Sequence, residues 1–223
     1  MKLIHCDLDT DIINSNYQHC EWIIEAPELF SKYVLELYKQ TEAEEGNFVL
    51  SEQDKELDIA KYVEIISDPL SINLNDKKIL NKLYSELSKS AYAEECYLHT
   101  QEVLSALQKY FAFLETSSNY FLEDDEEPDI IAIFKALNVK LSVYSENLFE
   151  LLWQYIKATS ELLKKKLIVL VNIRSYLTQE QVIELIKNAD YNEISLLLIE
   201  NCQKGCSTDL VHYIIIDKDG CEI

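Results

Sequence analysis

Glycine and proline are scarce in this sequence, which has three of each among 223 residues. Tight turns and irregular loops depend on these two residue types, so an all-β sandwich, which needs many turns, is disfavoured. Glycine occurs only at Gly46, Gly205 and Gly220. Neither Gly-x4-Gly-Lys-Ser/Thr nor Gly-x-Gly-x2-Gly can be built from these positions, so a backbone cradle for nucleotide phosphates is not expected.

Other catalytic patterns are also missing. No serine lies in a Gly-x-Ser-x-Gly turn, and the four histidines have no carboxylate or thiol partner at motif spacing (His5, His19, His99 and His212). Arginine occurs once, as Arg174, so no arginine-rich recognition helix exists. The sequence therefore predicts a protein that is not an enzyme and that does not read DNA bases.

Long apolar runs are absent, and the first residues lack the apolar core of a signal peptide. We expect a cytoplasmic protein whose six cysteines are reduced. Cys202, Cys206, His212 and Cys221 would form a zinc set with the spacing Cys-x3-Cys-x5-His-x8-Cys. This spacing fits no common zinc pattern, so scattered structural thiols are favoured over a metal site.

Acidic residues dominate the charge, with 40 Asp and Glu against 20 Lys and Arg and a formal net charge of −20. Binding to phosphates is driven by Lys and Arg, so this balance argues against a nucleic-acid ligand. A local basic groove can nevertheless coexist with acidic outer faces.

The hydrophobic pattern changes twice along the chain. Short β-branched or apolar runs indicate strands near both ends, at residues 21–24, 47–50, 62–67, 167–172, 194–200 and 211–216. Between about residues 75 and 163 the apolar spacing becomes three and four, which indicates helices. We therefore predict an α/β domain formed by residues 1–70 and 165–223, and an inserted helical domain formed by residues 71–164.

Two helices of the middle block have narrow apolar seams. One seam is formed by Leu104, Leu107, Phe111 and Leu114, and the other by Leu148, Leu152, Tyr155, Thr159 and Leu162. Narrow seams are typical of helices packed lengthwise against one another. After the second seam, Lys164, Lys165 and Lys166 precede "LIVLVN", which is apolar on both faces as in a central parallel strand. Thr178 and Gln181 then predict a capping box for a helix over 179–188.

Three stretches resemble one protein family. In Phe134–Thr178, Phe-Lys-Ala-Leu is followed at the family's separation by Lys-Lys-Lys-Leu, an apolar strand with Asn, and Ser-Tyr-Leu-Thr. The other stretches are Ile23–Gln40 and Ser71–Leu87, the latter matching a leucine-rich helix after an Asn-containing turn. On these residues the chain resembles the fourth CRISPR adaptation protein of type II-A systems, in its short form.

The resemblance implies an α/β head domain, with a P-loop-like sheet that lacks the nucleotide loop, and an inserted, elongated α-helical leg domain. It also implies a homotetrameric ring whose basic hole accepts double-stranded DNA by its ends, without catalysis. The ring would assist spacer acquisition beside the CRISPR integrase and the effector nuclease. Two alternatives remain open: an acidic protein–protein adaptor that holds no DNA, and a degenerate nucleotide-binding switch.

Calcium is the cofactor that the resemblance implies, and the acidic run "EDDEEPD" offers the hard oxygen ligands that calcium takes. The run is not an EF-hand, because no glycine lies at its sixth place, and on charge alone a solvated acidic loop is the alternative. The predicted ligands are Glu123, Asp124, Asp125, Glu126, Glu127 and Asp129.

The predicted DNA-binding residues are lysines that form local basic islands in the acidic chain. Lys78, Lys82 and Lys89 recur at spacings of four and seven, which places them on one helical face. The alternative for each lysine is an ordinary solvated face or, for 164–166, a complement to a helix dipole. The full set is Lys77, Lys78, Lys82, Lys89, Lys135, Lys140, Lys157, Lys164, Lys165 and Lys166.

Overall fold

The computed structural model describes residues 1–123, 128–145, 147–204 and 210–223. The chain divides into two compact units. The first unit is Met1–Leu74 with Val143–Ile223, and the second is Asn75–Ser142. The second unit is thus an insertion into the first, and each is described by itself.

A five-stranded parallel sheet organises the first unit. Its strand order is β5 (Val63–Ile66), β6 (Leu167–Val171), β7 (Ser195–Glu200), β2 (His19–Ile24) and β8 (Val211–Ile216). All five residues of β6 are buried, because β5 and β7 flank the strand and helices cover both faces. The prediction of a central parallel strand after the three lysines is confirmed.

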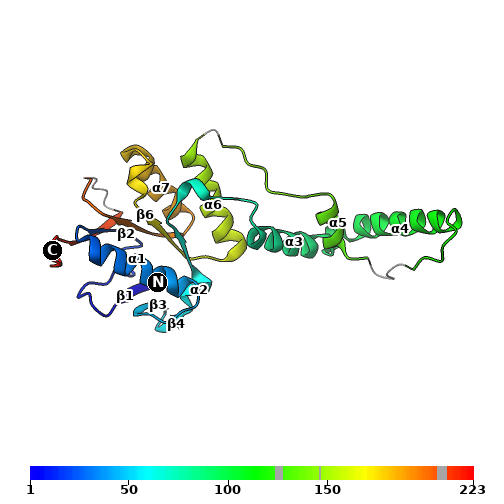
Figure 1. Ribbon diagram of the computed structural model, residues 1–223. Helices are drawn as coiled ribbons and strands as arrows, with labels where there is room; N and C mark the ends of the chain where they lie inside the picture. Colours follow the sequence, from blue (N-terminus) through cyan, green and yellow to red (C-terminus); the bar gives the residue numbers. More distant parts are fainter. Residues whose placement is uncertain (124–127, 146, 205–209) are drawn as a thin grey trace. The chain divides into compact units, whose positions relative to one another are not determined.

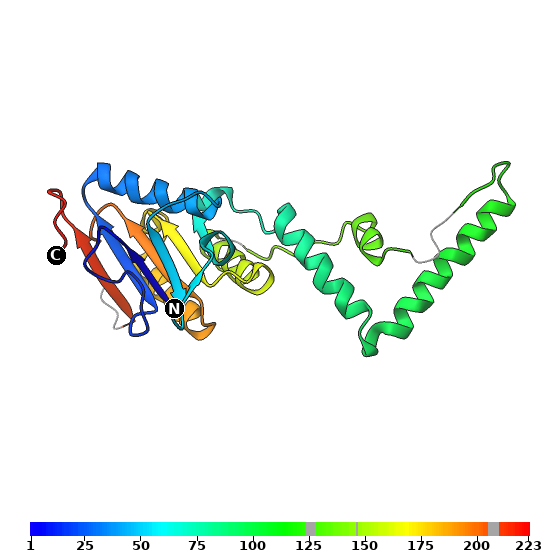
Figure 2. The same cartoon turned by 90° about the horizontal axis from the view of Figure 1, so that it is seen from below.

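Alternate strand residues contact different layers. Trp22, Val169 and Leu197 pack in one apolar cluster with α1 (Pro27–Thr41) and a small antiparallel sheet. That sheet has the order β1 (Lys2–His5), β3 (Phe48–Glu52), β4 (Lys55–Leu57). Ile168 and Leu198 pack in a second cluster with α6 (Leu148–Leu163) and α7 (Gln179–Tyr191). The sheet is therefore the middle of three layers, as Figures 1 and 2 show.

Short elements and caps connect these layers. α2 (Ile59–Tyr62) leads directly into β5, and two 3₁₀ turns, η1 (Pro69–Ser71) and η2 (Ile173–Ser175), follow strand ends. The predicted capping box is present at the start of α7, where Thr178 Oγ1 accepts the N–H of Gln181 and the Gln181 side chain accepts the N–H of Thr178. The two predicted strands at 194–200 and 211–216 are confirmed as β7 and β8.

The second unit contains three helices among its described residues: α3 (Lys77–Ala91), α4 (Glu94–Thr116) and α5 (Ile130–Ala136). α3 and α4 meet at a bend, where the Thr100 hydroxyl donates to the carbonyl of Ala91 over 2.7 Å. Figure 2 shows α3 and α4 diverging from this bend. After α5, an extended segment returns along α3, and its contacts are described with the candidate site.

Two expectations differ from the structure. The helical domain predicted over 71–164 is longer than the second unit, because α6 buries Leu152 and Ile156 completely against the sheet of the first unit. The seam predicted on α4 is buried at Leu104 alone. Leu107 and Leu114 are 44% and 40% exposed, because α5 forms the other wall of an open groove along this face and does not close over it.

Among the described residues, no helix is long and apolar enough to cross a membrane.

Candidate nucleic-acid interface

Helix α3 carries four of the predicted lysines. The helix begins after Asp76, whose Oδ1 accepts the N–H of Ile79 over 2.8 Å and so caps the first turn. Ile79 and Tyr84 are the buried residues of α3, whereas its lysines are exposed, at Lys77, Lys78, Lys82 and Lys89. The predicted face is therefore open to solvent.

The segment that returns along α3 places Lys140 beside the same helix. The Asn75 side chain exchanges two hydrogen bonds with the backbone of Leu141, at 2.9 and 3.1 Å. The Tyr84 hydroxyl donates to the carbonyl of Val139 over 3.0 Å. Lys140 lies between these two anchors and is exposed. The second unit thus brings Lys140 next to the N-terminal half of α3, from a position about sixty residues away in sequence.

The charge partners of these lysines differ. Lys89 Nζ pairs with Glu86 Oε1 at 2.7 Å on the same helix. Among the described residues, no carboxylate forms an ion pair with Lys77, Lys78, Lys82, Lys135 or Lys140. Lys135 lies in the last turn of α5 and is exposed. These five side chains are sterically free to meet a phosphate.

The four predicted lysines of the first unit have other surroundings. Lys157 is exposed on α6 and lies 3.8 Å from Glu161. Lys164 ends α6 in a left-handed conformation, with φ of 60°. Lys165 Nζ donates to the carbonyls of Ala60 and Val63 at 2.9 and 2.6 Å. It also lies 3.6 Å from Glu64, and only 11% of its side chain is exposed.

Lys166 is engaged as well. Its Nζ lies 2.5 Å from Glu52 Oε2, and this hydrogen bond lowers the pKa of the Glu52 carboxyl. The backbone N–H of Lys166 donates to Tyr62. Lys165 and Lys166 therefore tie the start of β6 to α2, β5 and the small sheet. Phosphate contacts by these two side chains would require breaking internal bonds.

The predicted calcium ligands are mostly outside the described residues. Asp124, Asp125, Glu126 and Glu127 are not described. Glu123 is exposed, and Asp129 is the cap of α5, where its Oδ1 accepts the N–H of Ile131 over 2.8 Å. Asp129 keeps its second oxygen for another ligand.

The turn after β2 is where a nucleotide-binding sheet of this kind would hold phosphates. Here α1 begins at Pro27, which has no N–H, and its cap residue Ala26 makes no side-chain hydrogen bond. This turn therefore lacks one of the backbone amides that a phosphate-binding loop presents, and it contains no glycine.

A buried charged cluster lies in the same sheet and was not predicted. Arg174 Nη2 donates to Glu21 Oε2 over 2.6 Å, and the backbone N–H of Arg174 donates to Glu200 Oε1 over 3.0 Å. All three residues are less than a tenth exposed. Burial, reinforced by the charge of Glu21, raises the pKa of Glu200 to about 7. The sequence contains a signal for this cluster: the apolar runs at 21–24 and 194–200 each include an acidic residue, and the chain has a single arginine that could pair with them.

Comparisons with known proteins agree on one family. The family model described as CRISPR-associated protein (Cas_Csn2) matches residues 40–220. A CRISPR-associated protein Csn2 of Streptococcus agalactiae is 27% identical over 197 residues, which are 88% of this chain and 86% of that protein. One of Enterococcus faecalis is 28% identical over 143 residues, 61% of this chain and 62% of that protein. The crystal structure of Stu0660 of Streptococcus thermophilus has a TM-score of 0.61 at 14% identity, covering 97% of this chain and 75% of that one, which shows a shared fold.

Proposed function

This chain belongs to the CRISPR-associated Cas_Csn2 family, and we propose that it is a non-catalytic double-stranded DNA-binding protein that assists spacer acquisition as a homotetrameric ring. It would work in the cytoplasm, together with the CRISPR integrase and the effector nuclease. The proposal on catalysis is supported by the turn after β2, which has a proline where a phosphate loop needs amides.

The observation that carries DNA binding is the set of exposed lysines in the second unit that have no ion-pair partner among the described residues. Lys77, Lys78 and Lys82 lie in the first half of α3 and Lys140 lies on the segment bonded to this helix, in a chain whose net charge is −20. A face kept basic against that background favours a polyanionic ligand.

Recognition should be independent of base sequence. The single arginine, which is the residue type that most often reads guanine, is buried with Glu21. Lysines reach phosphates as point charges and carry no sequence information. The expected ligand is therefore the DNA backbone.

The first prediction tests this face with a fourfold variant of Lys77, Lys78, Lys82 and Lys140, each changed to alanine. We expect weaker binding to every duplex sequence alike, because only phosphate contacts are lost. The slope of log affinity against log salt should flatten by about 0.9 for each contact removed. Fluorescence anisotropy with labelled linear duplexes at several salt concentrations measures both quantities.

A matched control removes the same charge elsewhere. Lys39, Lys55, Lys187 and Lys218 are exposed and lie in the first unit. Their fourfold alanine variant should keep the salt slope of the unmodified protein. An equal loss of DNA affinity in both variants would indicate a general effect of net charge. An unchanged salt slope in the variant of Lys77, Lys78, Lys82 and Lys140 would reject the proposed DNA-binding face.

Calcium is proposed as the cofactor of the acidic run. Its candidate ligands are Glu123, Asp124, Asp125, Glu126, Glu127 and Asp129, with Asp129 offering the oxygen that does not cap α5. The second prediction is that millimolar calcium raises the melting temperature by mass action and that magnesium does so less. Changing Asp124 and Asp125 to Asn should remove the effect. Absence of binding heat and of any melting shift would reject this cofactor.

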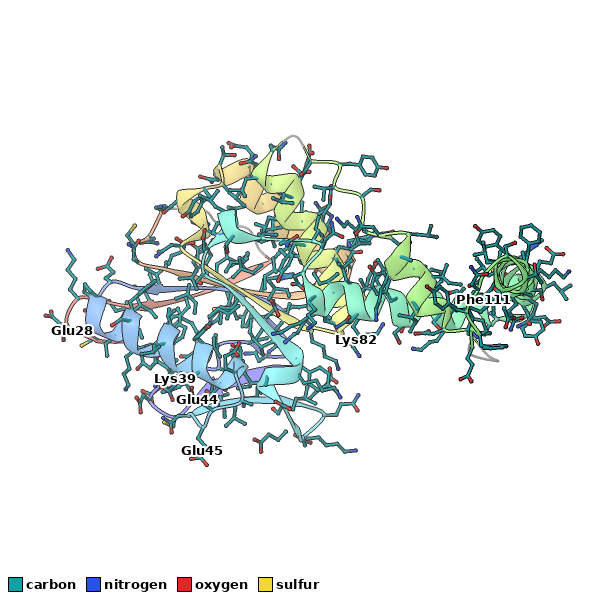
Figure 3. The ribbon with its side chains drawn as sticks, turned by 45° about the vertical axis from the view of Figure 1, so that its right-hand side comes forward. Glu28, Lys39, Glu44, Glu45, Lys82 and Phe111 are labelled. Carbon is teal, nitrogen blue, oxygen red and sulfur yellow. The ribbon has the colours of Figure 1, made fainter. Side chains whose placement is uncertain are left out.

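An acidic adaptor is the second candidate function, and the surface around α1 favours it. Glu28, Glu42, Glu44 and Glu45 are exposed on α1 and the residues that follow it. Figure 3 shows the labelled glutamates of this region pointing outward. Such a surface suits a basic protein partner. An adaptor of this kind would bind its partner with unchanged affinity after the lysine substitutions and would not bind free DNA.

A further inference from the structure

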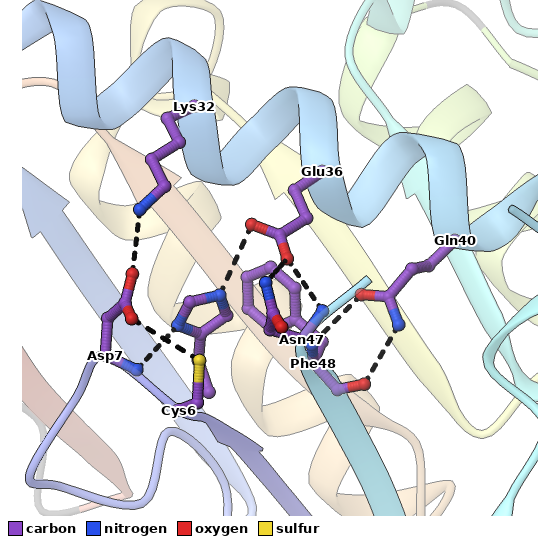
Figure 4. Close-up of polar contacts among 8 residues, drawn as sticks. Cys6, Asp7, Lys32, Glu36, Gln40, Asn47 and Phe48 are labelled. Atoms are coloured by element: carbon purple, nitrogen blue, oxygen red, sulfur yellow. Dashed lines mark hydrogen bonds and ion pairs between the residues drawn. The ribbon is translucent and has the colours of Figure 1, made fainter. Parts of the chain in front are cut away.

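The turn after β1 collects three chemically different side chains that the proposed DNA-binding function does not use. His5 is the last residue of β1 and is 2% exposed, whereas Cys6 and Asp7 are exposed. One potential ligand atom of each residue lies within 4.8 Å of the others. Figure 4 shows a dashed line that joins the thiol of Cys6 to the carboxylate of Asp7 at this turn.

The imidazole ring of His5 is fixed by hydrogen bonds at both of its nitrogens and by two aromatic rings. The N–H of Asp7 donates to His5 Nδ1 over 3.1 Å, so Nδ1 carries a lone pair and Nε2 carries the proton. Nε2 faces Glu36 Oε2 at 3.3 Å. Glu36 is fixed in turn by the backbone and side-chain N–H groups of Asn47, at 2.7 and 2.8 Å. The rings of Tyr33 and Phe48 pack edge-on against the imidazole.

This is the support that metal-binding histidines have in proteins, where a carboxylate holds one ring nitrogen and so orients the other toward the ion. The lone pair of Nδ1 points to the side of the turn where Cys6 and Asp7 lie. In the structure the amide of Asp7 occupies that lone pair, so binding an ion would exchange one hydrogen bond for one metal bond.

The other two donors are also placed for a shared ion. Cys6 Sγ and Asp7 Oδ1 are 3.4 Å apart. Ligands of a tetrahedral zinc ion, with bonds of about 2.0–2.3 Å, are separated by roughly 3.3–3.8 Å. Lys32 binds the opposite oxygen of Asp7, Oδ2, at 2.7 Å and leaves Oδ1 available.

We propose that His5, Cys6 and Asp7 form a zinc site, with His5 Nδ1, Cys6 Sγ and Asp7 Oδ1 as ligands and solvent at the fourth position. A mixed nitrogen, sulfur and oxygen set suits a borderline-soft divalent ion and does not suit calcium, which takes oxygen. With Cys6 as thiolate, the local charges of Cys6, Asp7, Glu36 and Lys32 sum to about −2, which one divalent ion neutralises.

The alternative zinc site, which the sequence spacing suggests near the C-terminal end, is less consistent with the structure. The zinc set considered from spacing, Cys202, Cys206, His212 and Cys221, has its Cys206 outside the described residues. His212 is stacked on Tyr17 with ring centroids 4.4 Å apart.

Cobalt(II) titration of the full chain under reducing conditions tests the site, because a thiolate bound to cobalt gives a near-ultraviolet charge-transfer band. We expect one cobalt per chain, with this band, and displacement of cobalt by zinc. Cys6→Ser should abolish the band and weaken affinity by at least about tenfold. Asp7→Asn should keep the band and weaken affinity. Lys32→Met should tighten binding, which a merely misfolded variant could not do.

The matched controls are Cys96→Ser and Cys202→Ser, since both thiols are exposed and neither belongs to the cluster of His5, Cys6 and Asp7. They should bind cobalt as the unmodified protein does. The proposal is overturned if the unmodified chain gives no thiolate band, if the band survives in Cys6→Ser, or if Cys202→Ser removes it. Circular dichroism of each variant establishes that the fold is kept, and if Cys6→Ser unfolds, the opposite effects of Asp7→Asn and Lys32→Met decide.

Discussion

Glu200, the last residue of β7, is fully buried at the end of a strand whose other residues, apart from Ser195, are apolar. Its Oε1 accepts the N–H of Arg174, and Oε2 has no hydrogen-bond partner among the described residues. Glu21 lies in the next strand with its own bond to Arg174. Glu21 thus bonds the guanidinium group of Arg174 and Glu200 bonds its backbone N–H, and all three residues are buried, so the neutral form of Glu200 is favoured.

The third prediction concerns the pH dependence that follows. In the folded chain the pKa of Glu200 is raised to about 7. In an unfolded chain the pKa of a glutamate is about 4.3. Between these values the folded state binds a proton that the unfolded state lacks, so the free energy of unfolding decreases as pH rises. Glu200→Gln should be more stable than the unmodified chain at about pH 8, by roughly 2 kcal/mol beyond any difference at about pH 5.

Denaturant unfolding at both pH values measures this difference. Glu184→Gln is a suitable control, because Glu184 is exposed on α7, and its stability relative to the unmodified chain should not change with pH. If Glu200→Gln shows the same pH profile as the unmodified protein, Glu200 is ionised in the folded state.

The three consecutive lysines have different surroundings in the structure, which the sequence does not predict. Lys164 is exposed in a left-handed conformation, Lys165 donates to carbonyls of Ala60 and Val63, and Lys166 pairs with Glu52. The partners of the last two lie about a hundred residues earlier in the chain. Hydrophobic periodicity predicts the strand that follows, but it contains no information on which distant groups meet its first residues.

At the scale of elements, apolar runs were the most informative signal. The runs at 167–172, 194–200 and 211–216 correspond to β6, β7 and β8, because a strand buried on both faces must be apolar throughout. The strand at 47–50 corresponds to β3, but its place in a separate antiparallel sheet was not predicted. β1 was missed, since "KLIH" is short and ends in the polar His5.

Helix α4 shows the limit of the seam argument. Periodicity indicated a buried face, and the structure leaves two of its four residues exposed, Leu107 at 44% and Leu114 at 40%. Outside that face, Leu98, Val103 and Phe113 are 72%, 49% and 66% exposed. Leu107, Tyr110, Phe111 and Leu114 line a groove of about 510 Å³ shared with α5. An apolar surface of this extent on a long helix favours association with a second copy of the chain.

The fourth prediction uses the part of α4 outside this groove. Replacing Leu98, Val103 and Phe113 with glutamine keeps helix propensity and removes apolar contact area, so it should dissociate the proposed tetramer. Light scattering should report a mass near four times 26.0 kDa for the unmodified chain and a smaller one for the variant. The control variant changes three exposed glutamates of the same helix to glutamine and should have the mass of the unmodified chain; they are Glu95, Glu102 and Glu115. A monomeric unmodified chain at micromolar concentration would reject the ring.

For the whole molecule, the net charge of −20 and the basic face on α3 act in opposite directions. A strongly acidic protein repels DNA at long range, so a phosphate backbone binds only where several lysines contact it at once. A closed ring provides such simultaneous contact from several copies, and a single copy does not. Affinity should therefore depend on assembly more steeply than on any one lysine.

The fifth prediction follows from closure. A ring can reach DNA only by passing over an end, so a linear duplex carrying biotin at both ends should lose binding when streptavidin is added before the protein. When streptavidin is added after binding, the complex should resist a salt concentration that dissociates it from unblocked DNA, because release of counterions no longer frees a threaded ring. Gel mobility with calcium present separates these species, and covalently closed circles of equal length should bind poorly. Equal binding to linear, blocked and closed DNA would mean that the protein binds the side of the duplex as an open surface, and the basic face on α3 would then act without a ring.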